Sequence, residues 1–177
     1  ISLTWEIHEG KGEDFAEFVS HTWEYCYDTF QPKPVETDYT PDYTKEILSH
    51  FFIESFVGDR PLNYNSGVHM RTDDCQNTGS AEVGFVGRVL LNAFNAWEYG
   101  WKSNRADLKE NAAKVFDTYL VNGFSPAGFF KEFVDYRTGY EETVFSIRRQ
   151  SEGLYAIFHY LDFEKRNGRK HPEWEAK

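Results

Sequence analysis

Two adjacent acids, Asp73 and Asp74, are the residues of this chain of 177 amino acids whose spacing first suggests acid–base chemistry. They lie in residues 64–77, between two stretches with helical periodicity. Neighbouring carboxylates repel each other, so one can keep its proton near neutral pH and act as a general acid while the other stays ionised. Turns and helix starts also recruit Asp. A turn or a cap of the next helix is therefore an equally good interpretation of the pair.

A third acid, Glu152, is expected on a helix that begins near residue 147. The polar positions of this helix share one stripe, at spacings of four, three and four: Arg148, Glu152, Tyr155 and His159. A carboxylate on a buried helix must be paired or neutralised, and Arg148 stands one turn earlier. Glu152 is therefore either an internal ion-pair partner of Arg148 or a second catalytic acid.

Arg148 and Arg149 stand at the start of the same predicted helix, where the helix dipole favours anions. Two guanidinium groups at that place can bind a carboxylate or sulfate group of a ligand. The same two cations can instead neutralise Asp73 and Asp74 across a cleft. Both interpretations put the arginines at a polar site.

A second type of chemistry is suggested by His69, near Arg71 and Tyr64. In a lyase, a neutral base removes the proton next to a carboxylate, and a tyrosine hydroxyl protonates the leaving oxygen. No spacing in the sequence connects these three residues, so the lyase hypothesis has weaker support than acid–base catalysis by a pair of carboxylates. The residues expected to bind a substrate are Tyr64, His69, Arg71, Gln76, Arg148, Arg149, Gln150 and Tyr155.

The composition narrows the classes of partner. The chain has 19 Lys and Arg against 29 Asp and Glu and a formal net charge of −10, so a cationic surface for nucleic acid is not expected. No apolar run is long enough to cross a bilayer. The six histidines form no HxH or HExxH pattern, and neither Cys26 nor Cys75 has a partner at ligand spacing, so neither a metal nor another cofactor is expected.

Apolar residues at spacings of three and four predict five helices, over residues 12–30, 41–58, 80–99, 104–122 and 147–167. Pro172 begins a sixth. The third and fifth helices are apolar nearly all round, as buried helices are. Short connections join the third helix to the fourth and the fifth to the sixth, which predicts antiparallel hairpins. The fold class is therefore all-α.

Two connections are long, at residues 58–79 and 124–146. Because successive helices alternate in direction, both long links are expected at one end of the domain, beside the starts of the two buried helices. The second link is predicted to contain a small β-hairpin with Gly139 in the left-handed conformation. Residues 1–11 are predicted to be a strand or linker from a preceding domain, and residues 12–177 the helical domain.

This arrangement resembles the (α/α)6 toroid of the six-hairpin glycosidase superfamily. The starts of the two buried helices, residues 78–93 and 148–157, carry the resemblance. They are also weakly similar to each other, with Gly84 and Gly153 at matching places. Five helices and the beginning of a sixth correspond to about half of such a ring, so the chain is expected to be part of a larger protein.

The resemblance implies a glycoside hydrolase that acts on an oligosaccharide or polysaccharide, in the periplasm, at the cell surface or after secretion. In such an enzyme one carboxylic acid protonates the departing oxygen, and a second carboxylate is the nucleophile or activates water. Asp73, Asp74 and Glu152 are then the candidate catalytic residues. A polysaccharide lyase and a non-catalytic helical-hairpin module that binds glycan or protein are the alternatives. The open edge of a partial toroid also predicts self-association.

Overall fold

The structure, a computed structural model, describes residues 7, 9, 14–70, 75–85 and 87–177. It divides into two compact units, residues 1–40 and residues 41–177. The predicted domain boundary at residue 11 falls within residues 10–13, which are outside the described part of the chain. The larger unit begins at Pro41, so the first predicted helix belongs to the smaller unit.

The described part of the smaller unit holds one helix, α1 (Phe15–Phe30), as the apolar spacing predicted. The carboxylate of Asp14 accepts a hydrogen bond from the backbone N–H of Glu17 (3.2 Å) and so caps the first turn. The helix ends at Gln31, whose φ of 43° is left-handed. None of its residues is buried, so its apolar side has no core within this unit.

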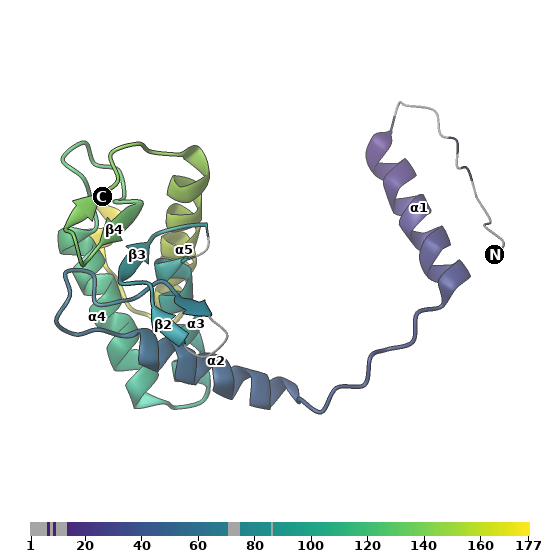
Figure 1. The fold of residues 1–177 in the computed structure, drawn as a ribbon, viewed down its shortest axis with the longest axis horizontal. Coiled ribbons are helices and arrows are strands. Elements are labelled where there is room, and N and C mark those ends of the chain that lie inside the picture. Colours follow the sequence, from purple (N-terminus) through teal and green to yellow (C-terminus); the bar gives the residue numbers. More distant parts are fainter. Residues whose placement is uncertain (1–6, 8, 10–13, 71–74, 86) are drawn as a thin grey trace. The chain divides into compact units, whose positions relative to one another are not determined.

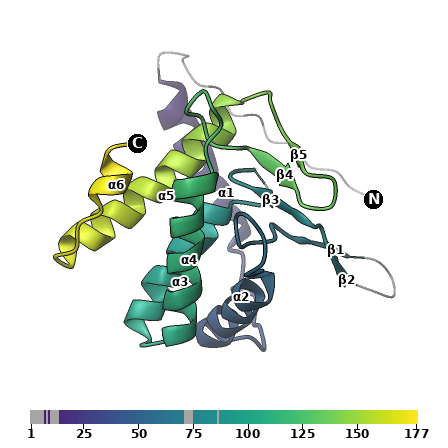
Figure 2. The same ribbon diagram turned by 90° about the vertical axis from the view of Figure 1, so that its left-hand side faces the viewer.

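In the larger unit the helices α2 (Pro41–Ser55), α3 (Val89–Lys102), α4 (Ala106–Asn122), α5 (Ile147–Arg166) and α6 (Pro172–Glu175) confirm a mainly helical fold. Helix α3 packs against both α4 and α5 (Figures 1 and 2). The interior of this group is apolar and aromatic, and the rings of Phe116 and Tyr160 stack with centroids 3.9 Å apart. Helix α4 ends at Asn122 as predicted and begins at Ala106, two residues after the predicted start at residue 104.

Two small antiparallel sheets lie in the long links. Strand β1 (Val68–Met70) pairs with β2 (Cys75–Asn77). Strand β4 (Phe133–Asp135) pairs with β5 (Tyr140–Glu141), which confirms the predicted hairpin, with Gly139 at φ 71°. The hairpin gains a third strand that the sequence did not reveal, because β3 (Ser80–Glu82) pairs with the other side of β4 (Figure 2).

The predicted start of the third helix is therefore wrong. The chain forms strand β3 at residues 80–82, turns, and becomes helical only at Val89. Ser80, Ala81 and Glu82 oppose Asp135, Val134 and Phe133, so strand pairing takes the backbone groups that a helix would use. Gly84 and Gly87, which disfavour a helix interior, stand in the turn between strand and helix.

The fifth helix differs from its prediction in burial. Gly153, Ala156 and Tyr160 lie on its buried side. Its opposite side is solvent-exposed, with Ile147 91% and Phe158 67% accessible. The expected all-round burial is therefore wrong, because no other described element of the unit covers this side of α5 in the way that α3 covers the buried one.

A buried carboxylate fastens the end of α5. Glu164 is 1% exposed and accepts hydrogen bonds from Trp97 Nε1 of α3 (2.7 Å), from Arg169 Nε and Nη2 (2.7 and 2.6 Å) and from His171 Nε2 (2.8 Å). Burial by itself raises the pKa of Glu164, but these donors outweigh it and hold the pKa below its ordinary value. One side chain thus joins α3, α5 and the segment before α6.

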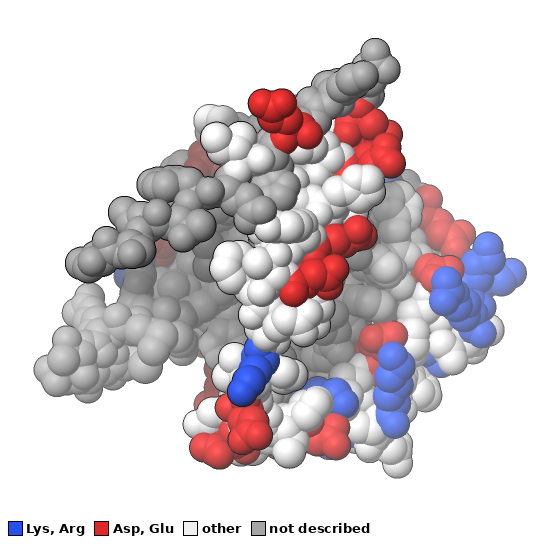
Figure 3. All heavy atoms as spheres, turned by 90° about the vertical axis from the view of Figure 1, so that its right-hand side faces the viewer, with Lys and Arg blue, Asp and Glu red and all other residues white. Residues whose placement is uncertain are grey.

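The charged surface agrees with the acidic composition. Figure 3 shows one face, on which the Lys and Arg side chains among the described residues are scattered between acidic ones rather than gathered into one patch. Several of the cations pair locally, as Lys102 does with Glu98 (2.9 Å) and Lys45 with Asp42 (2.9 Å). Among the described residues, no helix is both long and apolar enough to cross a membrane.

Candidate functional site

The two long links meet at the starts of α3 and α5. Strand β3 belongs to the first link and leads into α3, while β4 and β5 belong to the second link and lead into α5. Because β3 and β4 pair directly, the links lie side by side, as the alternation of helix directions predicted. We call this region the loop-bearing end, and define it as strands β3–β5, the turn between β3 and α3, and the first two turns of α5. The name turn 83–88 refers to the described residues of that turn, which are 83–85, 87 and 88.

The turn 83–88 has a strained backbone. Phe85 and Arg88 have φ values of 60° and 41°, in the left-handed region that non-glycine residues seldom occupy. Such strain persists only where the surroundings hold the backbone, and it is concentrated at functional sites. Here the N–H of Phe85 donates to Glu152 Oε2 (2.5 Å), and Arg88 Nε donates to the carbonyl of Phe85 (3.0 Å).

Two glycines let the turn approach α5. A Cβ on Gly84 would stand 2.8 Å from Arg149 Cα, and a Cβ on Gly153 would stand 2.9 Å from a methyl carbon of Val83 and 3.0 Å from the ring of Phe130. All three distances are too short for a side chain. The two glycines that the sequence placed at matching positions therefore lie on the two sides of one contact, where the residues after β3 pack closely against α5.

Glu152 is the centre of the charged groups at the loop-bearing end. Besides the Phe85 N–H, its carboxylate accepts a hydrogen bond from Arg148 Nε (3.3 Å) and lies 3.6 Å from Arg88 Nε. Burial by itself raises the pKa of Glu152, but the Phe85 N–H and the two guanidinium groups outweigh it, so the pKa lies below its ordinary value. Glu152 is therefore ionised at neutral pH, which suits an ion-pair partner and does not suit a proton donor.

The arginines also contact an aromatic ring. The guanidinium carbons of Arg148 and Arg149 lie 4.7 and 5.8 Å from the centroid of the Phe85 ring. Phe85 itself is 43% exposed. No hydrogen bond described at this end uses the Nη groups of Arg148, which bonds through Nε alone. Arg149 Nη1, by contrast, lies 3.5 Å from Glu132 Oε2. An exposed ring next to guanidinium groups is a surface on which a flat, hydroxylated ligand can stack and form hydrogen bonds.

Gln150 has a structural role at this end. Its amide oxygen accepts from the N–H of Phe130 (2.9 Å), and its amide nitrogen donates to the carbonyl of Phe130 (3.0 Å) and to Glu132 (3.0 Å). Glu132 is 1% exposed and also accepts from the N–H of Ser146 (2.5 Å). The predicted substrate contact of Gln150 has no support in this arrangement, because the amide already fixes the second long link.

The other predicted site residues lie in different places. Tyr155 is 56% exposed on α5, with its ring 4.3 Å from that of His159. Tyr64 is fully buried and lines a pocket between α2 and α3. His69 and Gln76 are backbone partners across β1 and β2, and only their backbone is described. Arg71, Asp73 and Asp74 fall on residues 71–74, which lie outside the described residues.

Sequence reasoning missed Phe85 and Arg88 as site residues. It counted Phe85 among the apolar positions of a helix and Arg88 among the polar ones. The signal that could have identified them is the pair Gly84 and Gly87 on either side of an aromatic residue, since two glycines so close together favour a turn over a helix. In the part of the chain that the structure describes, no three His, Cys, Asp or Glu side chains are close enough to hold a metal ion.

Comparison with known proteins gives no match. No protein-family model, no curated protein and no solved structure is significantly similar to the chain.

Proposed function

We propose that the chain is part of a carbohydrate-active protein with (α/α)6 toroid architecture, and that the loop-bearing end binds an oligosaccharide or polysaccharide. The observation that carries the proposal is the pairing of β3 with β4, which joins both long links beside the starts of α3 and α5. It gathers the exposed ring of Phe85, the guanidinium groups of Arg88 and Arg148, and Glu152 within one region. Aromatic faces stack on sugar rings, and guanidinium groups donate to their hydroxyl or acidic substituents.

Hydrolysis of glycosidic bonds is the reaction that we propose for the whole protein. It needs a carboxylic acid that is protonated near neutral pH. Because the pKa of Glu152 is lowered, Glu152 suits this role poorly, and Asp73 or Asp74 is the better candidate for the acid. Glu152 then serves as a positioning residue that holds the turn 83–88.

A non-catalytic glycan-binding module is the second candidate. One observation favours it: Glu82, Glu152 and the neighbouring Glu132 each accept a hydrogen bond from a backbone N–H, and Glu141 of β5 pairs with Lys131 (2.7 Å). Carboxylates used in this way stabilise loops, whereas acid–base catalysis needs at least one carboxylate that is not already bound to another group of the protein. A module of this kind would bind glycan through Phe85 and Arg148 without turning it over.

The test uses the intact protein with Asp73→Asn, Asp74→Asn and Arg148→Ala, each assayed for binding and turnover on a polysaccharide panel. If the protein is a hydrolase, the wild type forms new reducing ends. One of the two Asp variants is then expected to form them at least about a hundredfold more slowly while it binds the polysaccharide as tightly as the wild type. Arg148→Ala is expected to weaken binding about threefold to tenfold. Lys165→Ala, an exposed cation near the other end of α5, is the control.

The outcomes separate the candidates. Binding without turnover in the wild type supports the module. An absorbing unsaturated product supports a lyase. If no glycan binds, or if Arg148→Ala binds as tightly as the wild type, the assignment of carbohydrate to the loop-bearing end is wrong.

A further inference from the structure

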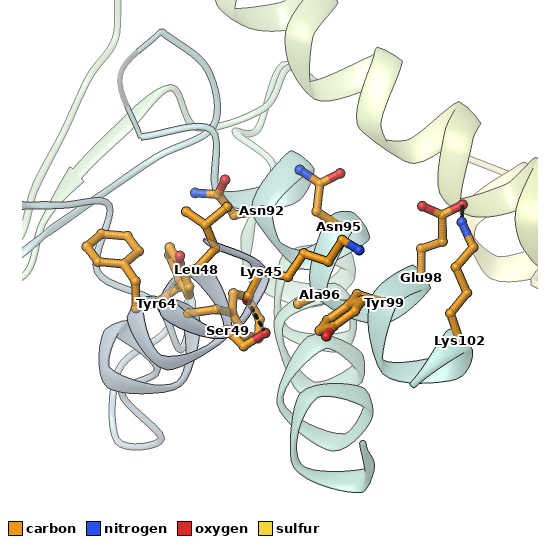
Figure 4. A pocket seen from close by; sticks show the side chains of 12 residues that line it. Lys45, Leu48, Ser49, Tyr64, Asn92, Asn95, Ala96, Glu98, Tyr99 and Lys102 are labelled. Atoms are coloured by element: carbon orange, nitrogen blue, oxygen red, sulfur yellow. Dashed lines mark hydrogen bonds and ion pairs between the residues drawn. The ribbon is translucent and has the colours of Figure 1, made fainter. Parts of the chain in front are cut away.

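A pocket of about 540 Å³ lies between α2 and α3, lined by residues from both helices and by Tyr64 of the first link. Cavities of this size are typical of small-molecule sites, which are mainly apolar and carry a few polar groups. Figure 4 shows side chains of the two helices on either side of the pocket. The loop-bearing end as defined above contributes none of the lining residues.

One part of the pocket wall is apolar and aromatic. Leu48, Phe51 and Phe52 come from α2, and Ala96 and Tyr99 come from α3. The rings of Phe52 and Tyr64 lie with centroids 5.4 Å apart. A wall of this kind stabilises the complex with a ring-shaped ligand, because the apolar face of the ligand is then removed from water.

A second part of the wall is polar and incompletely paired. The Tyr64 hydroxyl is buried and forms no hydrogen bond of ordinary geometry, although Ser55 and Asn92 lie beside it. Asn92 donates through Nδ2 to the carbonyl of Gly87 (3.0 Å), which leaves its amide oxygen available. The Asn95 side chain is exposed and has no hydrogen-bond partner among the described residues. A buried hydroxyl without a partner is costly, so a ligand group that reaches it gains more than an exposed contact would give.

The charged groups at the pocket are already compensated. Lys45 pairs with Asp42 at 2.9 Å, and this contact raises the pKa of the Lys45 ammonium group. Glu98 and Lys102 pair with each other at 2.9 Å, as Figure 4 shows. Because all three charged side chains of the wall are paired, the pocket has no strong preference for an anionic or a cationic ligand.

We propose that the pocket between α2 and α3 binds an uncharged ring compound that has one apolar face and a hydroxylated edge. The apolar face lies on Phe52 and Ala96, and the edge forms hydrogen bonds with Tyr64, Asn92 and Asn95. A sugar ring and a phenol share this chemistry. The inference does not depend on the function proposed for the loop-bearing end, since the two sets of residues are separate.

The experiment is ligand-observed NMR on the full chain with two probes, methyl β-D-glucopyranoside and 4-methylphenol. Saturable binding of the first identifies a sugar site, and saturable binding of the second identifies a site for phenols. Tyr64→Phe and Asn95→Ala are each expected to lower the affinity, about threefold to tenfold, for the probe that binds. Burial raises the pKa of Tyr64 to about 12, so the affinity is expected to be the same between about pH 6 and pH 9.

Tyr119→Phe is the matched control. The Tyr119 hydroxyl is also buried and unpaired, but Tyr119 does not line this pocket. Its loss is expected to leave the affinity unchanged. Each of these variants removes a group that makes no hydrogen bond of ordinary geometry, so none is expected to lower the melting temperature, and loss of a costly buried hydroxyl can raise it. The proposal is overturned if neither probe binds saturably, if Tyr64→Phe and Asn95→Ala bind as the wild type does, or if Tyr119→Phe weakens binding equally.

Discussion

Three glutamates at or next to the loop-bearing end act on the backbone. Glu82 accepts from the N–H of Gly87, Glu132 from that of Ser146, and Glu152 from that of Phe85. Each bond crosses a turn or joins a link to a helix. Buried or half-buried carboxylates need such donors, because an unsatisfied charge in the interior is expensive. The acids therefore set the shape of the site, whatever ligand it binds.

Replacing Glu152 by Gln is expected to lower the free energy of unfolding by about 1–3 kcal/mol at pH 7, the usual range for a lost charge-assisted hydrogen bond. The folded-state pKa of Glu152 is lowered, so the stability it contributes is present above the ordinary Glu pKa of about 4.3 and is lost as the pH falls through the folded value. Urea unfolding at pH 7 and at lower pH measures this. The gap between wild type and variant should close in acid, and a gap that stays constant would contradict the assigned role.

At the scale of elements, Gly84 and Gly153 decide how closely the turn 83–88 approaches α5. Gly84→Ala is expected to destabilise the protein by about 1–3 kcal/mol, because the new Cβ would stand 2.8 Å from the backbone of Arg149. Gly67→Ala is the control, since its nearest neighbour would be a methyl carbon of Thr78 at 3.8 Å. Thermal unfolding of both variants compares them. Equal melting temperatures would mean that the turn moves without cost.

The cluster around Glu164 is the counterpart at the other end of α5. Glu164→Gln is expected to cost about 3–5 kcal/mol, because it leaves Arg169 and His171 without their buried partner. The lowered pKa of Glu164 means that this stability is lost as the pH falls through the folded value. Asp162→Asn is the control, as its pair with Arg166 is exposed and contributes at most about 1 kcal/mol. Chemical denaturation distinguishes the two, and similar losses would show that Glu164 is replaceable.

Local periodicity was enough to predict the helices and insufficient for the strand before α3. Apolar residues at spacings of three and four identify α5 to within one residue and α2 to within three, because a helix is stabilised by its own backbone. Strand β3 depends on β4, about fifty residues later, and nothing in residues 80–88 reveals that partner. The same limit applied to Glu152. Its pairing with Arg148 could be predicted from the four-residue spacing, but its bond to the Phe85 N–H could not.

For the whole molecule, every residue of the buried cluster among the described residues lies between Phe52 and Trp174, within the larger unit. Residues 41–177 produced alone are therefore expected to unfold in one cooperative transition. Calorimetry measures this, with agreement between the calorimetric and van't Hoff enthalpies as the criterion. A broad, non-cooperative transition would show that the core requires residues 1–40.

The expected self-association is a prediction at the same scale. Ile147, Leu154 and Phe158 form an exposed apolar stripe on α5, and such stripes mark protein contacts. Phe158→Glu is expected to shift the protein toward the monomer in sedimentation equilibrium, with Lys165→Glu as the control on the same helix. A wild-type protein that stays monomeric at high concentration would contradict the prediction.

The hydrogen bonds between β3 and β4 make the two long links one mechanical piece. A change of length or sequence in either link will be transmitted to the other, and through it to the first turn of both α3 and α5. Anyone who redesigns this protein must therefore exchange the two segments together. If only one segment were grafted, its strand would lack the partner strand with which it forms hydrogen bonds.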